Sequence, residues 1–134
     1  MKYGIFVFVI IGLLIMGAQV RKSEQTGRNA KKKEQKISYK KNIVPIFKKY
    51  CLPCHTEDEM NPSQLYLESY SDLMNGGKHG APVVPGQADS SIMIQKISAT
   101  PPFGDPMPFR FKRQFPADTL AILEKWINQG ARNN

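Results

Sequence analysis

Residues 51–55 read Cys-Leu-Pro-Cys-His, and in this chain of 134 residues they form the cluster whose types and spacing most clearly predict chemistry. Two cysteines separated by two residues and followed at once by a histidine are the attachment pattern of c-type haem. In that pattern Cys51 and Cys54 form thioether bonds to the porphyrin, and His55 is placed to bind the iron from one side. The spacing therefore predicts one covalently attached haem c per chain.

Other sites built on a cysteine pair fit the sequence less well. A thioredoxin-type redox pair needs a βαβ unit, and the sequence contains no alternating strand pattern of useful length. A zinc site needs four ligands, which Cys51, Cys54, His55 and His79 could just supply, but adjacent ligands at 54 and 55 are awkward for a tetrahedral metal. A purely structural role for the two cysteines, as free thiols packed in the core, is also disfavoured in an exported protein. With only two cysteines, a disulfide framework is excluded.

A second axial ligand for the iron would be a thioether sulfur or another imidazole. The candidates downstream of the haem motif are Met60, Met74, Met93, Met107 and His79. Met60 follows His55 too closely to reach the opposite face of a haem, and two methionines fall in predicted helices, where this residue more often packs in the core. Met107 stands between two prolines, in a stretch that can be neither helix nor paired strand. We expect Met107 to be the ligand, with His79 or an open position as alternatives.

Apolar spacing and capping residues predict four helices that position these ligands. No strand pattern competes with them, and the loops between them are rich in Pro and Gly. The fold class expected is therefore all-α, a small helical domain with long ordered loops around one haem. The predicted helices start near Ile43, at Ser69, at residues 89–91 and near Pro116, and they end at Cys51, before Gly76, before Pro101 and before Gly130.

The formal net charge of +8 is concentrated in one segment. Residues 21–41 hold nine Lys or Arg against two Glu, whereas residues 42–134 hold nine basic and nine acidic residues. The basic character therefore belongs to a tail, and the domain that follows is neutral overall. The domain has no basic stripe with interleaved aromatic residues, which argues against nucleic acid as a partner.

Residues 3–20 form an uncharged apolar run that would span about 27 Å as a helix, close to the thickness of a bilayer core. We expect residues 1–20 to be a signal peptide or, preferably, an uncleaved membrane anchor, because the run is long for a signal sequence. Residues 21–41 are predicted to be a basic flexible tether, and residues 42–134 the haem-binding domain. The positive-inside rule would place the tether in the cytoplasm, but haem c chemistry requires the outer side, and we give the haem more weight.

Several short segments occur in an order that resembles the planctomycete-type cytochrome c domain, a bacterial family of monohaem c-type cytochromes. They are Val-Pro-Ile-Phe at 44–47, the haem motif at 51–55, Leu-Tyr-Leu-Glu-Ser-Tyr at 65–70, Gly-Gly at 76–77, Val-Pro-Gly at 84–86, Ser-Ser at 90–91, Asp-Pro-Met-Pro at 105–108 and Trp-Ile-Asn-Gln-Gly-Ala at 126–131. The likeness covers residues 42–132. It implies a helical cytochrome c fold, with His55 as the proximal ligand and Met107 as the distal ligand. Where the family commonly opens its last helix with Thr or Ser, this chain has Phe-Pro-Ala at 115–117.

Together these observations predict an electron carrier and not an enzyme. Its partners would be redox donor and acceptor proteins, and the membrane through the N-terminal segment. The expected location is the periplasm, with the domain tethered to the outer face of the bacterial inner membrane. The alternative is a haem-based sensor or a peroxidase-like protein, in which the distal position would be exchangeable.

Overall fold

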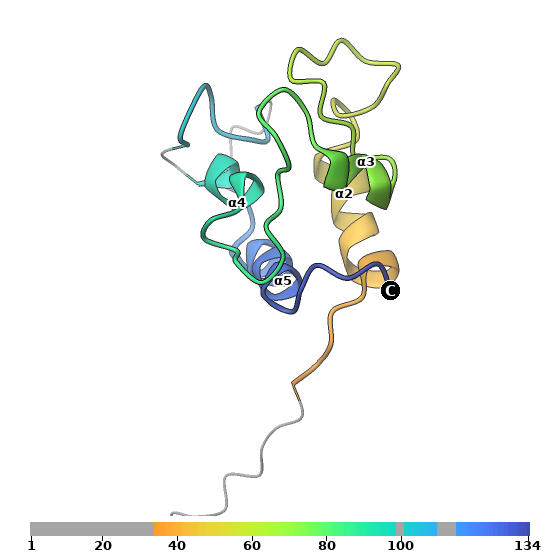
Figure 1. Cartoon of the computed structure of the whole chain (residues 1–134), viewed down its shortest axis with the longest axis vertical. Helices are drawn as coiled ribbons and strands as arrows, with labels where there is room; N and C mark the ends of the chain where they lie inside the picture. The colour runs from red at the N-terminus through yellow and green to blue at the C-terminus, as the bar shows by residue number, and fades with distance from the viewer. Residues whose placement is uncertain (1–33, 99–100, 110–114) are drawn as a thin grey trace, which may run out of the picture. The chain divides into compact units, whose positions relative to one another are not determined.

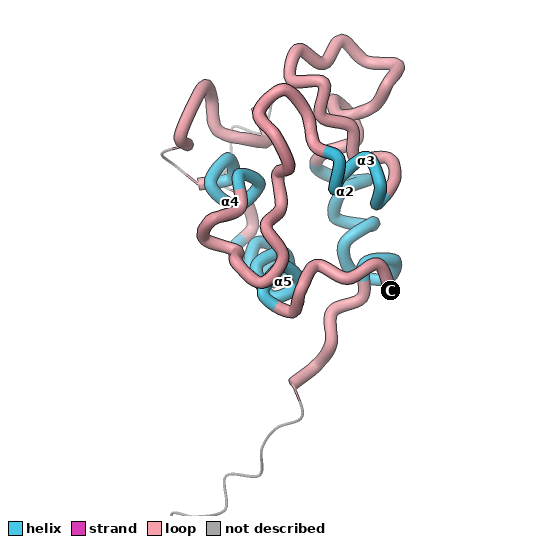
Figure 2. The backbone as a smooth tube through the Cα atoms, in the orientation of Figure 1, coloured by secondary structure: helices cyan, strands magenta, loops and turns pink. Residues whose placement is uncertain are grey.

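The computed structural model describes residues 34–98, 101–109 and 115–134, and within these ranges it contains helices and no strand (Figure 1). The elements are a π-helix η1 (Tyr39–Ile43) and four α-helices, α2 (Val44–Tyr50), α3 (Tyr70–Asn75), α4 (Ile92–Ile97) and α5 (Ala117–Asn128). Long loops connect them and account for much of the chain in Figure 2. The all-α prediction is confirmed for the part of the chain that the structure describes.

The predicted apolar helix at residues 3–20 lies outside the described residues. Among the residues that are described, no helix combines the length and the apolar character needed to cross a bilayer.

The capping residues identified in the sequence begin and end the helices as predicted. Ser69 is the N-cap of α3, and its hydroxyl oxygen accepts a hydrogen bond from the backbone N–H of Asp72. Gly76 ends the same helix with a φ of 76°, a backbone conformation that favours glycine. Pro116 precedes the first residue of α5, so the family's usual Thr or Ser is not needed for a helix to begin there.

The hydrophobic core forms where α5 packs against η1 and α4, and η1 in turn packs against α2 (Figure 1). Trp126 of α5 is 1% exposed, and its ring centroid lies 5.6 Å from that of Tyr39 in η1. Phe47 of α2 is also buried and makes an edge contact with the same tyrosine. Burial of such large side chains supplies most of the stabilisation of a small domain. The end of α2, which carries the haem motif, is therefore fixed to the core.

The packed unit starts at Gln35, before the predicted domain start at residue 42. Ile37 and Tyr39 are buried, although the sequence placed them in the flexible tether. The reason is tertiary. The backbone N–H groups of residues 37 and 39 donate to the side chains of Gln129 and Asn134, which lie more than ninety positions away. Residues 35–41 thus belong to the fold because the C-terminal segment supplies their hydrogen-bond partners.

Candidate functional site

The end of α2 leads directly into the cysteine pair. The backbone N–H of Cys51 donates to the carbonyl oxygen of Phe47 at 2.8 Å, which completes the last turn of the helix. The chain then folds back on itself, because the N–H groups of Cys54 and His55 both donate to the carbonyl oxygen of Cys51 at 3.0 Å. The three predicted residues Cys51, Cys54 and His55 are therefore brought together in one tight turn at the edge of the core.

The two cysteines have different surroundings. Cys51 is half-buried and packs against the apolar core, whereas Cys54 is exposed. Burial raises the pKa of the Cys51 thiol from 9.0 to about 12, because an apolar environment disfavours the thiolate. A zinc ligand must be a thiolate, whereas a thioether is uncharged and loses little on burial. The environment of Cys51 therefore suits a thioether bond better than a metal–thiolate bond.

The His55 ring is held by the loop that follows it. Its Nδ1 lies 2.9 Å from the carbonyl oxygen of Leu65, and the backbone N–H of Leu67 donates to the carbonyl oxygen of His55 at 3.0 Å. The Asn61 side-chain amide also donates to the Leu65 oxygen, at 2.6 Å. A carbonyl oxygen only accepts, so the proton of the neutral imidazole belongs on Nδ1. The other nitrogen, Nε2, then carries a free lone pair, as a metal-binding histidine requires.

Met107 lies in a separate part of the unit, in the loop that follows α4. It is half-buried, and its backbone N–H donates to the carbonyl oxygen of Lys96 at 2.6 Å. In Figure 1 this loop lies beside α4, whereas the loop that follows Cys51 lies near α2 and α3. The structure therefore does not show Met107 in contact with the haem motif; each is held by its own set of partners.

The other candidate ligands are engaged elsewhere or project into solvent. Met93 is buried in the core and Met74 packs against it, as predicted for helical methionines. Met60 is 95% exposed. The His79 ring stacks on Phe103, with ring centroids 4.1 Å apart.

The four residues of the zinc alternative do not form a metal site. Within the described ranges, no three His, Cys, Asp or Glu side chains gather in a way that could hold a metal ion. Cys51, Cys54, His55 and His79 all lie in those ranges, so the structure does not support this alternative.

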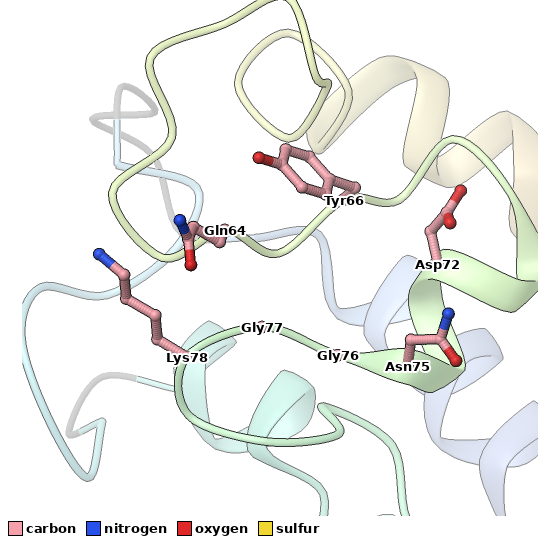
Figure 3. Close-up of a pocket in the computed structure, with 7 residues that line it drawn as sticks. All are labelled: Gln64, Tyr66, Asp72, Asn75, Gly76, Gly77 and Lys78. Carbon is pink, nitrogen blue, oxygen red and sulfur yellow. The ribbon is translucent and has the colours of Figure 1, made fainter.

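A pocket of about 430 Å³ opens between the 64–66 segment, α3 and the loop at 76–78. Figure 3 shows its lining, which consists of Gln64, Tyr66, Asp72, Asn75, Gly76, Gly77 and Lys78. Its lining side chains include two amides, a carboxylate and an ammonium, and none of the predicted haem residues. A porphyrin needs an apolar, water-excluding environment, so this pocket is not where we place the haem.

Sequence reasoning missed the groups that hold the two ligands. Leu65 binds the His55 ring through its backbone oxygen, which has no signal in the sequence because every residue carries one. Asn61 has a polar side chain in a loop, and only the fold shows that it reaches the same oxygen. The backbone oxygen of Lys96 in α4 accepts a hydrogen bond from the N–H of Met107, a contact that no sequence pattern indicates.

Residues 51–108 match the family model described as Planctomycete cytochrome C. The match confirms the resemblance drawn from the residues for this stretch, which is similar to a cytochrome c domain. Such a domain implies haem c and haem-based electron transfer. No curated protein and no solved structure matches the chain.

The donor atoms present suit haem c. The Cys51 sulfur lies against the apolar core, so a porphyrin attached there would extend that core. The Nε2 atom of His55 is the ring nitrogen that the Leu65 carbonyl does not occupy. Met107 offers a neutral sulfur from an irregular loop. These are the ligand types that proteins use for haem iron.

Proposed function

We propose that the chain is a monohaem c-type cytochrome that carries single electrons at the outer face of the bacterial inner membrane. Cys51 and Cys54 would attach the haem, and His55 and Met107 would bind its iron. When bound, haem c supplies an iron that gains and loses one electron. The observation that carries the proposal is the His55 ring, hydrogen-bonded at Nδ1 to the Leu65 carbonyl and located one residue after the cysteine pair.

The chain's own residues have three tasks in this mechanism. The Leu65 carbonyl and Asn61 fix the orientation of the His55 ring, so that little rearrangement accompanies electron transfer. The apolar core beside Cys51 excludes water, which favours the ferrous state. Met107 would supply a neutral sulfur to the iron, which would also favour the ferrous state relative to a second imidazole. If His55 and Met107 both bound the iron, substrates would have little access to it, as a carrier requires.

The location rests on the chemistry of the motif and on the N-terminal sequence. Haem c is attached after export, and residues 3–20 are apolar enough in sequence to serve as an anchor or an export signal. A basic tether between the anchor and the packed unit would let the domain move between a donor and an acceptor protein near the membrane.

The full chain, produced in a host that attaches haem c, tests the proposal. We expect the intact protein to carry the added mass of one haem and to show, when ferric, the weak red absorption band of a methionine–iron bond. Fractionation should recover it with the membrane, and a fusion reporter at its C-terminus should be active outside the cytoplasm. A chain without haem mass would overturn the proposal. A haem protein that lacks the band and binds carbon monoxide rapidly when reduced would instead support the sensor or peroxidase alternative.

A further inference from the structure

One lysine contacts the Met107 loop at several points. The Lys96 ammonium, in the last turn of α4, donates to the carbonyl oxygen of Phe103 at 2.6 Å and to that of Asp105 at 2.5 Å. It also lies 4.8 Å from the centroid of the Phe103 ring. The backbone oxygen of the same lysine accepts the N–H of Met107. Both polar ends of Lys96 are therefore bound to the segment that carries the predicted distal ligand.

The turn at Gly104 makes this arrangement possible. Gly104 has a φ of 52°, and a Cβ built there would lie 3.7 Å from the lysine Nζ. The left-handed conformation turns the chain between the two carbonyls, so that both approach the same ammonium. Carbonyl groups bound to a cation form stronger hydrogen bonds than those bound to neutral donors.

Among the described residues, little else holds the segment 101–109. None of residues 101–109 is buried, and Gly104, Asp105 and Pro106 are exposed. The other contact described for it is the stacking of His79 on Phe103, a surface contact. A loop without buried apolar side chains keeps its position through its polar contacts. Here Lys96 makes most of the contacts that the structure shows.

We propose that Lys96 is the positioning residue that keeps Met107 available as the distal ligand, an inference that rests on the proposed function. The ammonium fixes the loop at Phe103 and Asp105, and the backbone oxygen fixes the ligand residue itself. Without the ammonium, only the hydrogen bond between the Lys96 backbone oxygen and Met107 remains. The loop then opens more often and exposes the distal position. Lys96 acts through the loop and does not itself touch the iron.

The experiment compares Lys96→Leu, Lys96→Gln and Lys96→Arg in the full-length holoprotein. Lys41→Leu is the matched control, because it removes the same charge from an exposed side chain in η1. Three readouts follow Met107: the red methionine–iron band, the rate of carbon monoxide binding to the reduced protein, and hydrogen exchange at the Met107 amide. The midpoint potential is measured as well, since loss of the sulfur ligand lowers it.

We expect Lys96→Leu to weaken the band, lower the potential and accelerate carbon monoxide binding about tenfold, as the loss of charge-assisted hydrogen bonds implies. Lys96→Gln keeps one donor nitrogen and should show smaller changes, so it provides the test if the leucine variant folds poorly. Lys96→Arg should restore most of the native behaviour, and Lys41→Leu should retain it. A purely structural role would lower the melting temperature without these changes in ligation.

The two proposals fail in different ways. If the native protein has the methionine band and both neutral Lys96 variants keep native carbon monoxide kinetics, the inference about Lys96 is overturned alone. If the native protein lacks the band and Met107→Ala changes nothing, Met107 is not the ligand, and both the ligand assignment and the role of Lys96 are overturned.

Discussion

The segment around His55 and the loop around Met107 differ in how the rest of the chain holds them. His55 follows a helix that is anchored in the core, and its ring and backbone are bound by residues 61–67. Residues 101–109, the described part of the Met107 loop, include no buried residue, and their described contacts are those with Lys96 and His79. One proposed ligand is thus supported by core packing and the other by polar contacts at the surface.

This difference has a consequence for function. Changes near His55 act on the attachment of the haem and on the stability of the whole unit, because they disturb the edge of the core. If Met107 is the distal ligand, changes near it should act on the iron while the core remains intact. Changes in the Met107 loop should therefore open the distal position of the proposed carrier. Changes in the haem motif should instead abolish haem attachment and folding.

The largest effect should come from removal of the two cysteines that are predicted to attach the haem. In the double variant Cys51→Ala/Cys54→Ala we expect no covalent haem and an unfolded domain, because a small domain without its cofactor buries too little apolar surface. Mass spectrometry and far-ultraviolet circular dichroism measure the two effects. A cooperative thermal transition in the haem-free variant would contradict this prediction, because it would show that the core is stable without haem.

Removal of the distal ligand should have a smaller effect. Met107→Ala should retain haem and fold, lose the methionine–iron band completely and cost no more than about 2 kcal/mol in the free energy of unfolding, as its half-buried side chain suggests. Met74→Ala is the matched control, because that methionine is also half-buried but packs against the core. It should lower stability and keep the band. If Met107→Ala unfolded the protein, the distal loop would be part of the core's support.

The support of the proximal ligand can be tested at Asn61. Asn61→Leu removes the amide that donates to the Leu65 carbonyl, and we expect a loss of about 1 kcal/mol in stability with the methionine band unchanged. Chemical denaturation measures this loss. Asn75→Ala, an exposed asparagine of α3, is the control and should change stability less. A loss of the methionine band in Asn61→Leu would show that the two sides are coupled.

At neutral pH the smallest effect is expected at Tyr39, whose ionisation affects stability only under basic conditions. Burial raises the pKa of Tyr39 above its ordinary value of 10.0, with Tyr70 and Asp72 adding to the shift. The unfolded chain therefore releases this proton at a lower pH than the folded chain. Stability falls as the pH rises above 10, with a slope of at most about 1.4 kcal/mol per pH unit.

Tyr39→Phe should reduce that slope while leaving stability near neutral pH little changed. Denaturation curves at several pH values between neutral and strongly basic conditions measure it. An unchanged slope in the variant would assign the alkaline loss to other groups and not to the core around Tyr39.

The sequence by itself determined the local features of this protein. The cysteine–histidine motif, the Ser69 cap and the Gly76 stop act within a few residues, so their types and spacing are sufficient to predict them. The exclusion of Met74 and Met93 as ligands also followed from helical periodicity, and the structure places both in or against the core. The family resemblance added the order of these segments.

Only the tertiary structure decided how the ligands are held and where the fold begins. Residues 35–41 look like a charged tether until Gln129 and Asn134, distant in sequence, supply partners for their backbone. The Leu65 carbonyl contacts the His55 ring and the Lys96 ammonium contacts the loop that carries Met107, and both contacts depend on how loops turn in space. Every residue carries the same backbone oxygen, and a lysine ammonium can be either solvated or hydrogen-bonded within the protein. Neither contact can therefore be predicted from the sequence alone.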